Sequence, residues 1–244
     1  MTTATNDTPV ALITGASRGL GLEIAHAYAR QGLRLILTAR GEADLERAAR
    51  ELRTQTNVLA LACDVGQPEC AGQLVEAGRQ RFGRVDVLIN NASELGPSPL
   101  PELEHLPVET LLDIVRTNVA GPLRLIQRVL PLMRTQDSGL IVNVTSDAGV
   151  QAYPTWGGYG ASKAALEHLS RVLAAELEGT GVRVYVVDPG DMDTAMHRAA
   201  EPGVDLSHLP GPATVAPFFV RLLDEQAPFG RFEAQRLLAG AALS

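Results

Sequence analysis

Cysteine is almost absent from this 244-residue chain, which contains only Cys63 and Cys70. These two residues form neither a paired zinc motif nor a framework of disulfides, so we expect both to be ordinary thiols. Residues 1–9 also lack the charged-then-apolar plan of a signal peptide. A reducing cytoplasm is therefore the expected location.

Two further absences limit the class of function. No stretch approaches the roughly 20 uninterrupted apolar residues of a membrane span. The formal charge of −7 is spread along the chain without a basic block, which argues against binding to nucleic acid or to an anionic membrane. A hydrophobic fraction of 45% is enough for a sizeable core, and we expect one domain over residues 1–244.

The chain does contain an alternation of short apolar runs and longer helix-like segments. The strand-like runs are Val10–Thr14, Leu33–Thr38, Val58–Ala62, Val85–Asn90, Leu140–Thr145 and Val182–Val187. The helix-like segments are Leu20–Gln31, Glu42–Thr54, Glu69–Phe82, Pro107–Arg134, Gly158–Glu178 and Ala213–Asp224. This alternation predicts an α/β, doubly wound fold in which helices cover both faces of a parallel sheet.

A glycine-rich turn follows the first strand-like run. It reads Thr14-Gly15-Ala16-Ser17-Arg18-Gly19-Leu20-Gly21. Where a strand turns into a helix, such glycines let backbone amides and the helix N-terminus approach a pyrophosphate. Glycine at an ordinary tight turn is the alternative, but its placement after the first strand favours cofactor binding.

The second strand-like run ends without the carboxylate that an NAD enzyme usually offers to the ribose hydroxyls. Thr38-Ala39-Arg40 stands there instead. Arg40 suits a phosphate, and together with Arg18 it would supply two guanidiniums for an adenosine 2′-phosphate. The sequence therefore predicts NADP(H) in preference to NAD(H), with a solvated Arg40 as the alternative.

Tyr159 and Lys163 are spaced to share one face of a helix. A neighbouring ammonium favours the phenolate, so Lys163 is expected to bring the Tyr159 pKa from about 10 towards neutral pH. Ser146 follows another apolar run and would hydrogen-bond an oxygen that gains negative charge during carbonyl reduction. A tyrosine and a lysine four residues apart also occur by chance, but Ser146 and the glycine turn accompany this pair.

Asn118 lies in a helix-like segment, four residues before Pro122. Proline cannot donate an amide hydrogen to the Asn118 carbonyl, which is left free for a water molecule. A simple helix kink at Gly121-Pro122 is an equally good interpretation, and the two are compatible.

In these motifs the chain resembles the short-chain dehydrogenase/reductase family, and the resemblance runs from Val10 to about Thr194. The residues that carry it are the glycine pattern, Asn90-Asn91-Ala92, Asn118, Ser146, Tyr159, Lys163 and Asp188-Pro189-Gly190. It implies a Rossmann-like, seven-stranded, mainly parallel sheet in the order 3-2-1-4-5-6-7. It also implies a homodimer or homotetramer that uses the long helices around Pro107–Arg134 and Gly158–Glu178.

The resemblance assigns roles to individual residues. It implies that Tyr159 exchanges the substrate proton, that Lys163 holds the nicotinamide ribose and that Asn118 supports a relay water. Asp64 and Val65 look like adenine contacts. The other implied cofactor contacts are Gly15, Ser17, Arg18, Gly19, Leu20, Gly21, Arg40, Asn91, Ala92, Pro189, Gly190, Met192 and Thr194.

The chain departs from the family pattern at several positions. Ser93 stands where glycine is more common, and Asp188 replaces the usual asparagine before Pro-Gly. Asp191 and Asp193 add acidity near the nicotinamide pocket, which weakens the case for an anionic substrate. The closing Asp-Gly-Gly of many relatives is missing from Leu237–Ser244.

The leading hypothesis is an NADP(H)-dependent oxidoreductase that interconverts a small carbonyl compound and its alcohol. The alternative is a non-catalytic NADP(H)-binding regulator or scaffold. We expect a mobile substrate segment near 192–212. No metal is expected, because His197 and His208 are not spaced with other ligands as a metal site.

Overall fold

A seven-stranded parallel sheet forms the centre of the protein, in a computed structural model that describes residues 8–227 and 229–240. The order of its strands is β3-β2-β1-β4-β5-β6-β7, as the family resemblance implies. The strands are β1 (Val10–Thr14), β2 (Arg34–Thr38), β3 (Val58–Ala60), β4 (Val87–Asn90), β5 (Gly139–Val144), β6 (Val182–Asp188) and β7 (Arg231–Glu233). β1, β4 and β5 are buried along their whole length, because helices cover both faces of the sheet.

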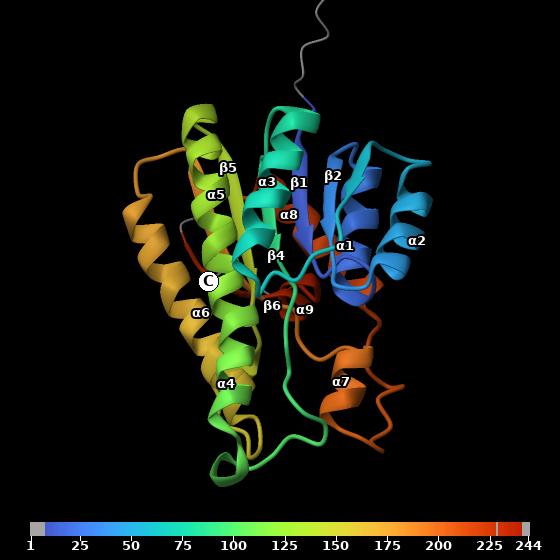
Figure 1. The fold of residues 1–244 in the computed structure, drawn as a ribbon, viewed down its shortest axis with the longest axis vertical. Coiled ribbons are helices and arrows are strands. Elements are labelled where there is room, and N and C mark those ends of the chain that lie inside the picture. The colour runs from blue at the N-terminus through green and yellow to red at the C-terminus, as the bar shows by residue number, and fades with distance from the viewer. Residues whose placement is uncertain (1–7, 228, 241–244) are drawn as a thin grey trace, which may run out of the picture.

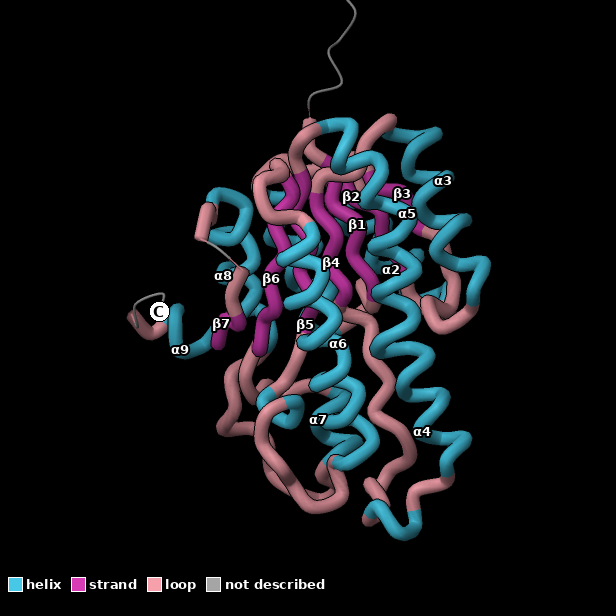
Figure 2. Tube along the Cα trace, turned by 90° about the vertical axis from the view of Figure 1, so that its left-hand side faces the viewer, coloured by secondary structure: helices cyan, strands magenta, loops and turns pink. Residues whose placement is uncertain are grey.

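The helices pack in two layers, one on each face of the sheet (Figures 1 and 2). One face carries α1 (Gly19–Arg30), α2 (Glu42–Leu52) and α8 (Pro212–Asp224), whose apolar residues share a core with the odd positions of β1. The other carries α3 (Pro68–Phe82), α5 (Gly121–Gln136) and the end of α6 (Gly157–Glu176), packed against the even positions of β1. A side-chain period of two directs Leu12 and Ile13 of β1 to these opposite layers.

The long helix expected over 107–134 is interrupted rather than regular. It begins as α4 (Val108–Val115), passes through one π-helical stretch, η2 (Arg116–Ala120), and continues as α5. Asn118 lies inside η2 and Pro122 begins the next turn, so the expected irregularity falls at the candidate relay residue. π-Bulges of this kind are frequent at functional sites.

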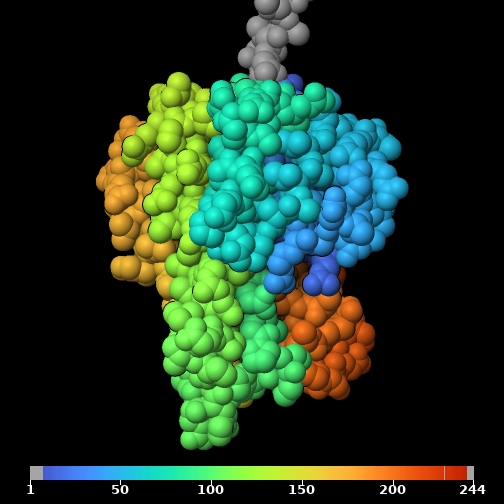
Figure 3. Space-filling view, viewed as in Figure 1, coloured from blue at the N-terminus to red at the C-terminus, as the bar shows by residue number. Residues whose placement is uncertain are grey.

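The carboxyl ends of the strands meet the shorter helices. These are η1 (Leu103–His105), η3 (Asp147–Gly149), α7 (Ala195–Ala200) and α9 (Ala234–Leu238), which the sequence reading does not predict. In Figure 3 the orange segment around α7 forms a lobe beneath the blue and cyan half of the molecule, and in Figure 1 it lies at the same end as α4. Among the described residues, no helix is both long and apolar enough to cross a membrane.

Candidate active site

A cavity of about 1020 Å³ lies at the carboxyl ends of the strands and joins the glycine turn to the Tyr159–Lys163 pair. Such an edge of a doubly wound sheet is where ligands bind in this architecture. The predicted residues that line it are Gly15, Ser17, Arg18, Gly19, Leu20, Arg40, Asp64, Val65, Asn91, Ala92, Ser146, Tyr159, Lys163, Pro189, Gly190, Met192 and Thr194. Gly21 and Asn118 do not line it but contact residues that do, Gly15 and Ser93 respectively.

The glycine turn has the backbone shape that its sequence predicts. Gly15 and Gly19 have φ values of +66° and +57°, which side chains rarely adopt. A Cβ on Gly19 would meet no atom within 4 Å, so the turn leaves open space for a ligand. At Gly21, a Cβ would lie 2.4 Å from the carbonyl oxygen of Gly15, so only glycine allows the helix to start this close to the strand. The turn therefore fits a pyrophosphate.

Asn91 ties the end of β4 to the end of β1. Its Nδ2 donates to the carbonyl oxygens of Thr14 at 2.9 Å and of Gly15 at 3.3 Å. The backbone amides of Asn91 and Ala92 donate to Thr14 Oγ1 at 3.0 and 2.9 Å. This side chain therefore holds the glycine turn against the neighbouring strand.

Arg40, at the cavity wall, forms an ion pair with Glu94 in the loop after β4. Its Nη1 lies 2.9 Å from Glu94 Oε2, and the arginine side chain is 63% exposed. An exposed ion pair of this kind contributes about 0–1 kcal/mol, so a phosphate can replace the carboxylate at little cost. Arg40 is therefore neither free in solvent nor committed to a buried partner.

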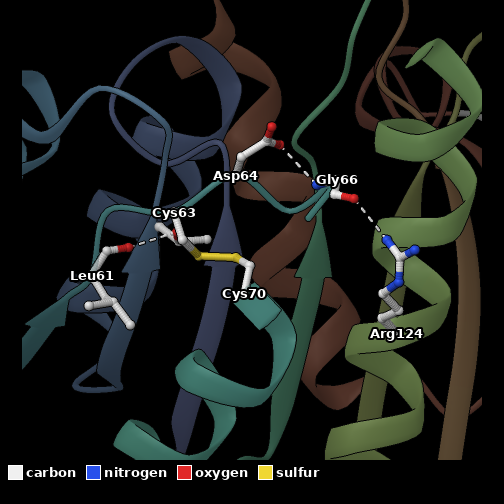
Figure 4. The surroundings of a disulfide bond; sticks show 7 residues. Leu61, Cys63, Asp64, Gly66, Cys70 and Arg124 are labelled. Atoms are coloured by element: carbon white, nitrogen blue, oxygen red, sulfur yellow. Dashed lines mark hydrogen bonds between the residues drawn. A yellow bond between two sulfur atoms is a disulfide. The ribbon is translucent and has the colours of Figure 1, made fainter. Parts of the chain in front are cut away.

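Cys63 and Cys70 are joined by a disulfide, so the expectation of two ordinary thiols is wrong in this structure. The bond links the segment after β3 to the first turn of α3, with the Cα atoms 5.7 Å apart (Figure 4). The closed loop contains Asp64 and Val65, the predicted adenine contacts. Asp64 Oδ1 accepts a bond from the Gly66 amide, and the Gly66 carbonyl accepts one from Arg124.

Tyr159 and Lys163 share the buried face of α6, as their spacing predicts. The Lys163 ammonium lies 5.3 Å from the centre of the Tyr159 ring and donates to the Val144 carbonyl at 2.9 Å. Lys163 is the only lysine of the chain, since the other 20 of the 21 basic residues are arginines. An arginine is always charged, so apart from its histidines the chain has a removable side-chain proton on a basic group only at Lys163.

The pKa values of this pair differ from the sequence expectation. Burial raises the pKa of Tyr159 above its usual range, while hydrogen bonds with Ser93 and Ser146 oppose that rise. The prediction of a lowered Tyr159 pKa is therefore wrong in this structure, because loss of solvent is the largest effect and the charges of Asp188 and Asp147 add to it. Burial also lowers the pKa of Lys163 to about 8, against the opposing effect of Asp188 and Glu167. At neutral pH, Tyr159 is thus a phenol and Lys163 is mainly charged.

Ser146 points its hydroxyl into a small polar cluster. Its Oγ donates to Asp147 Oδ1 at 2.9 Å, and the Tyr153 hydroxyl donates to Asp147 Oδ2 at 2.6 Å. Ser146 Oγ also accepts the Ala148 amide at 3.2 Å. Asp147 therefore holds the Ser146 hydroxyl at the cavity wall, and the hydroxyl would have to turn away from this carboxylate to donate to a substrate oxygen.

Asn118 uses both ends of its side chain to fix the loop after β4. Its Oδ1 accepts bonds from the Glu94 amide at 2.7 Å and Ser93 Oγ at 3.2 Å. Its Nδ2 donates to the Glu94 carbonyl at 2.8 Å and to Ser162 Oγ at 2.9 Å. Ser93, which the sequence marks only as a departure from glycine, therefore links Asn118 to Tyr159.

Two charged residues behind the pair, Glu167 and Arg231, escape the sequence analysis, which marks their neighbour Asp188 only as a departure from asparagine. Arg231 on β7 contacts both Glu167 on α6 and Asp188 at the end of β6. Glu167 lies four residues after Lys163, so helical spacing alone could have placed it beside the ammonium. Arg231 had no comparable signal, because its partners lie 64 and 43 residues away.

The comparisons with known proteins show the family of this chain. The family model for short chain dehydrogenases matches residues 9–205. A candidate ketoacyl reductase from Streptomyces coelicolor is 40% identical over 197 residues, covering 79% of this chain and 74% of the relative. The chain belongs to the short-chain dehydrogenase/reductase family, and it is an oxidoreductase of that family.

Solved structures show the same fold. An oxidoreductase from E. coli, yciK, has a TM-score of 0.86 at 32% identity, covering 93% of this chain and 95% of the other. A short chain dehydrogenase from Shigella flexneri, solved in complex with NADP, has a TM-score of 0.84 at 31% identity. The coverage there is 93% of this chain and 97% of the other.

Proposed function

We propose that this protein is an NADP(H)-dependent oxidoreductase that interconverts a carbonyl compound and an alcohol by hydride transfer. The observation that carries the proposal is the single cavity in which the glycine turn and the Ser146–Tyr159–Lys163 group meet. A cofactor site and a proton donor at one sheet edge are what carbonyl reduction requires.

Each side chain has a separate task in the proposed reaction. When bound, a reduced nicotinamide supplies the hydride. Tyr159 gives its hydroxyl proton to the carbonyl oxygen, and its raised pKa keeps that proton in place at neutral pH. Ser146 donates a hydrogen bond to the same oxygen as negative charge develops there. In the reverse direction, Tyr159 must first lose its proton, and the adjacent Lys163 ammonium favours that loss.

The cofactor preference rests on Arg18 and Arg40. Both line the cavity near the glycine turn, and guanidiniums suit bidentate contacts to a phosphate. The NADP-bound relative from Shigella flexneri supports the same choice. Arg40 would exchange Glu94 for the 2′-phosphate.

The substrate end favours an uncharged compound. Asp147 and Asp191 line it together with Leu95 and Trp156, whereas Asp193 is paired there with Arg198, so an anion would meet mainly negative charge. A small or medium uncharged carbonyl compound is the proposed substrate. The segment 192–212 supplies one wall of this end, including Met196 and Leu206, and we propose that it moves when substrate enters.

A homodimer or homotetramer is the proposed assembly. Leu112 on α4, Leu123 on α5, and Leu169 and Val172 on α6 are large apolar side chains with 37–46% exposure. Burying them against a second copy would remove this apolar surface from water. Light scattering on the purified protein would give the mass of the assembly.

Parallel titrations with NADPH and NADH, followed by nicotinamide fluorescence, test the proposal before the substrate is known. Tighter NADPH binding is expected, and NADH preference would contradict the assignment of Arg18 and Arg40. A panel of ketones and aldehydes with NADPH then separates the enzyme from a cofactor-binding regulator. Consumption of NADPH supports the enzyme, and tight binding without turnover on the whole panel supports the regulator.

A further inference from the structure

A buried cluster of charges lies directly behind the proton-transfer pair. Arg231 Nη2 donates to Asp188 Oδ2 at 2.7 Å, and Arg231 Nε donates to Glu167 Oε1 at 3.1 Å. The two carboxylate side chains are only 8% and 4% exposed, and that of Arg231 is 18% exposed. Buried charges at this depth require partners, because the protein interior solvates them poorly.

The remaining bonds of the two carboxylates fix their positions. Glu167 Oε1 accepts a bond from Thr145 Oγ1 at 2.7 Å, on the residue between Val144 and Ser146. Asp188 Oδ1 accepts one from the Gly190 amide at 2.9 Å, at the cavity wall. The cluster is therefore bonded to both sides of the proton-transfer site.

Two more exposed charged residues contact Arg231 or its partners from the solvent side. Glu233, on the same strand, lies 3.4 Å from Arg231 Nη1 and is half exposed. Arg171 lies 3.5 Å from the second oxygen of Glu167 and is 55% exposed. Solvent screens these outer residues, so Arg231 is the most buried cation in contact with the two carboxylates among the described residues.

We propose that Arg231 is a positioning residue that sets the charge balance at Lys163 and Tyr159 by neutralising Asp188 and Glu167. The proposal rests on the proposed function for its catalytic meaning. An aspartate at position 188 adds a negative charge where the family pattern more often has a neutral asparagine. Arg231 lies on the last strand and compensates for that charge.

The direction of the effect follows from electrostatics. Asp188 and Glu167 raise the pKa of Lys163, and Asp188 also raises the pKa of Tyr159. Arg231 opposes both carboxylates. Its removal leaves their field uncompensated, so both pKa values rise. The reverse change, Asp188→Asn, removes one negative charge and lowers both pKa values.

The single lysine of the chain makes this measurable without a substrate. Protein grown with lysine labelled by ¹³C at Cε gives one side-chain signal, from Lys163. We expect Arg231→Met to move its titration midpoint upward by about half a pH unit or more. Asp188→Asn should move it downward, and the double variant should lie between the two. Arg231→Gln keeps hydrogen bonding but not charge, and should act like Arg231→Met.

Arg236→Met is the matched control. Arg236 lies five residues further along on α9, is 74% exposed and pairs with Glu233. Its loss should leave the Lys163 midpoint unchanged. Equal midpoints in wild type, Arg231→Met and Arg231→Gln would overturn the proposal, as would shifts of the same sign for Asp188→Asn and Arg231→Met. If neither Arg231 variant folds, an unchanged or raised midpoint in Asp188→Asn overturns it.

Activity supplies the second readout. In alcohol oxidation, Arg231→Met should move the rising limb of the pH–rate profile to higher pH, because Tyr159 then loses its proton only at a higher pH. A wild type without turnover on any substrate would refute the proposed function, while the Lys163 midpoints would still decide the role of Arg231. A shifted midpoint with an unshifted rate profile would overturn the effect on Tyr159.

Discussion

The two ends of the cavity are built in different ways. At the cofactor end, neutral backbone contacts fix the glycine turn, and the charges, Arg40 and Glu94, are near the surface. At the proton-transfer end, Lys163, Glu167 and Asp188 are buried. The cation that pairs with the two carboxylates is Arg231, which lies on the last strand. The first end therefore depends on shape, whereas the second depends on the balance of charge.

This comparison predicts different kinds of damage at each end. At the cofactor end, added side-chain volume should lower NADPH affinity most, and replacement of the exposed charges should change it less. At the other end, a change of charge without a change of volume should be enough to alter the reaction.

Gly21→Ala should give the largest effect at the cofactor end. The new Cβ would lie 2.4 Å from the Gly15 carbonyl oxygen, so the backbone of the turn must move. We expect NADPH affinity to fall about 10- to 100-fold. Gly72→Ala is the control, since its Cβ meets no atom within 4 Å. Equal affinities in the two variants, measured by fluorescence titration, would show that the turn does not need glycine.

Reduction of the Cys63–Cys70 disulfide should lower stability. The bond closes a segment with a sequence separation of seven, so its loss should reduce the free energy of unfolding by about 2 kcal/mol. Urea titrations with and without dithiothreitol measure this. The Cys63→Ser/Cys70→Ser variant has no further cysteine and should not respond to the reductant. A wild type that is equally stable in both conditions would contradict the prediction.

Arg40→Ala should weaken NADPH binding about 10-fold, because the 2′-phosphate loses a charged partner. NADH lacks that phosphate, so its affinity should hardly change. Arg79→Ala, which removes an exposed arginine on α3, provides the control. Equal losses for both cofactors would mean that Arg40 supports the fold of the site rather than the phosphate.

Glu94→Gln should give the smallest effect, with the opposite sign. Glu94 holds Arg40 in an exposed ion pair, so its neutralisation should tighten NADPH binding about two- to threefold. The backbone of residue 94 stays bonded to Asn118 in this variant. A weaker NADPH complex would show that the carboxylate assists the cofactor site instead of competing with it.

The sequence predicts those features that depend on neighbours along the chain. The apolar runs predict six strands to within two residues at every end, and the glycine spacing predicts the turn. The spacing of Tyr159 and Lys163 predicts their shared face. These features follow from local periodicity and from backbone sterics, which depend only on residues close together in the sequence.

The sequence could not predict features that depend on burial or on distant partners. The Tyr159 pKa is raised because the folded chain removes water from around the phenol. Arg231 meets Asp188 only because β6 and β7 are adjacent in the sheet. The cysteine pair was missed because its pairing requires the end of β3 to lie beside the start of α3.

Tyr159→Phe tests the central claim most directly, with turnover and NADPH affinity measured on the same preparation. The account predicts at least a 100-fold loss of turnover, roughly the contribution of general acid catalysis, with cofactor affinity retained. Tyr153→Phe is the comparison, since Tyr153 is the other tyrosine near Ser146, and it should keep most of the activity. Turnover that survives Tyr159→Phe but not Tyr153→Phe would contradict the account.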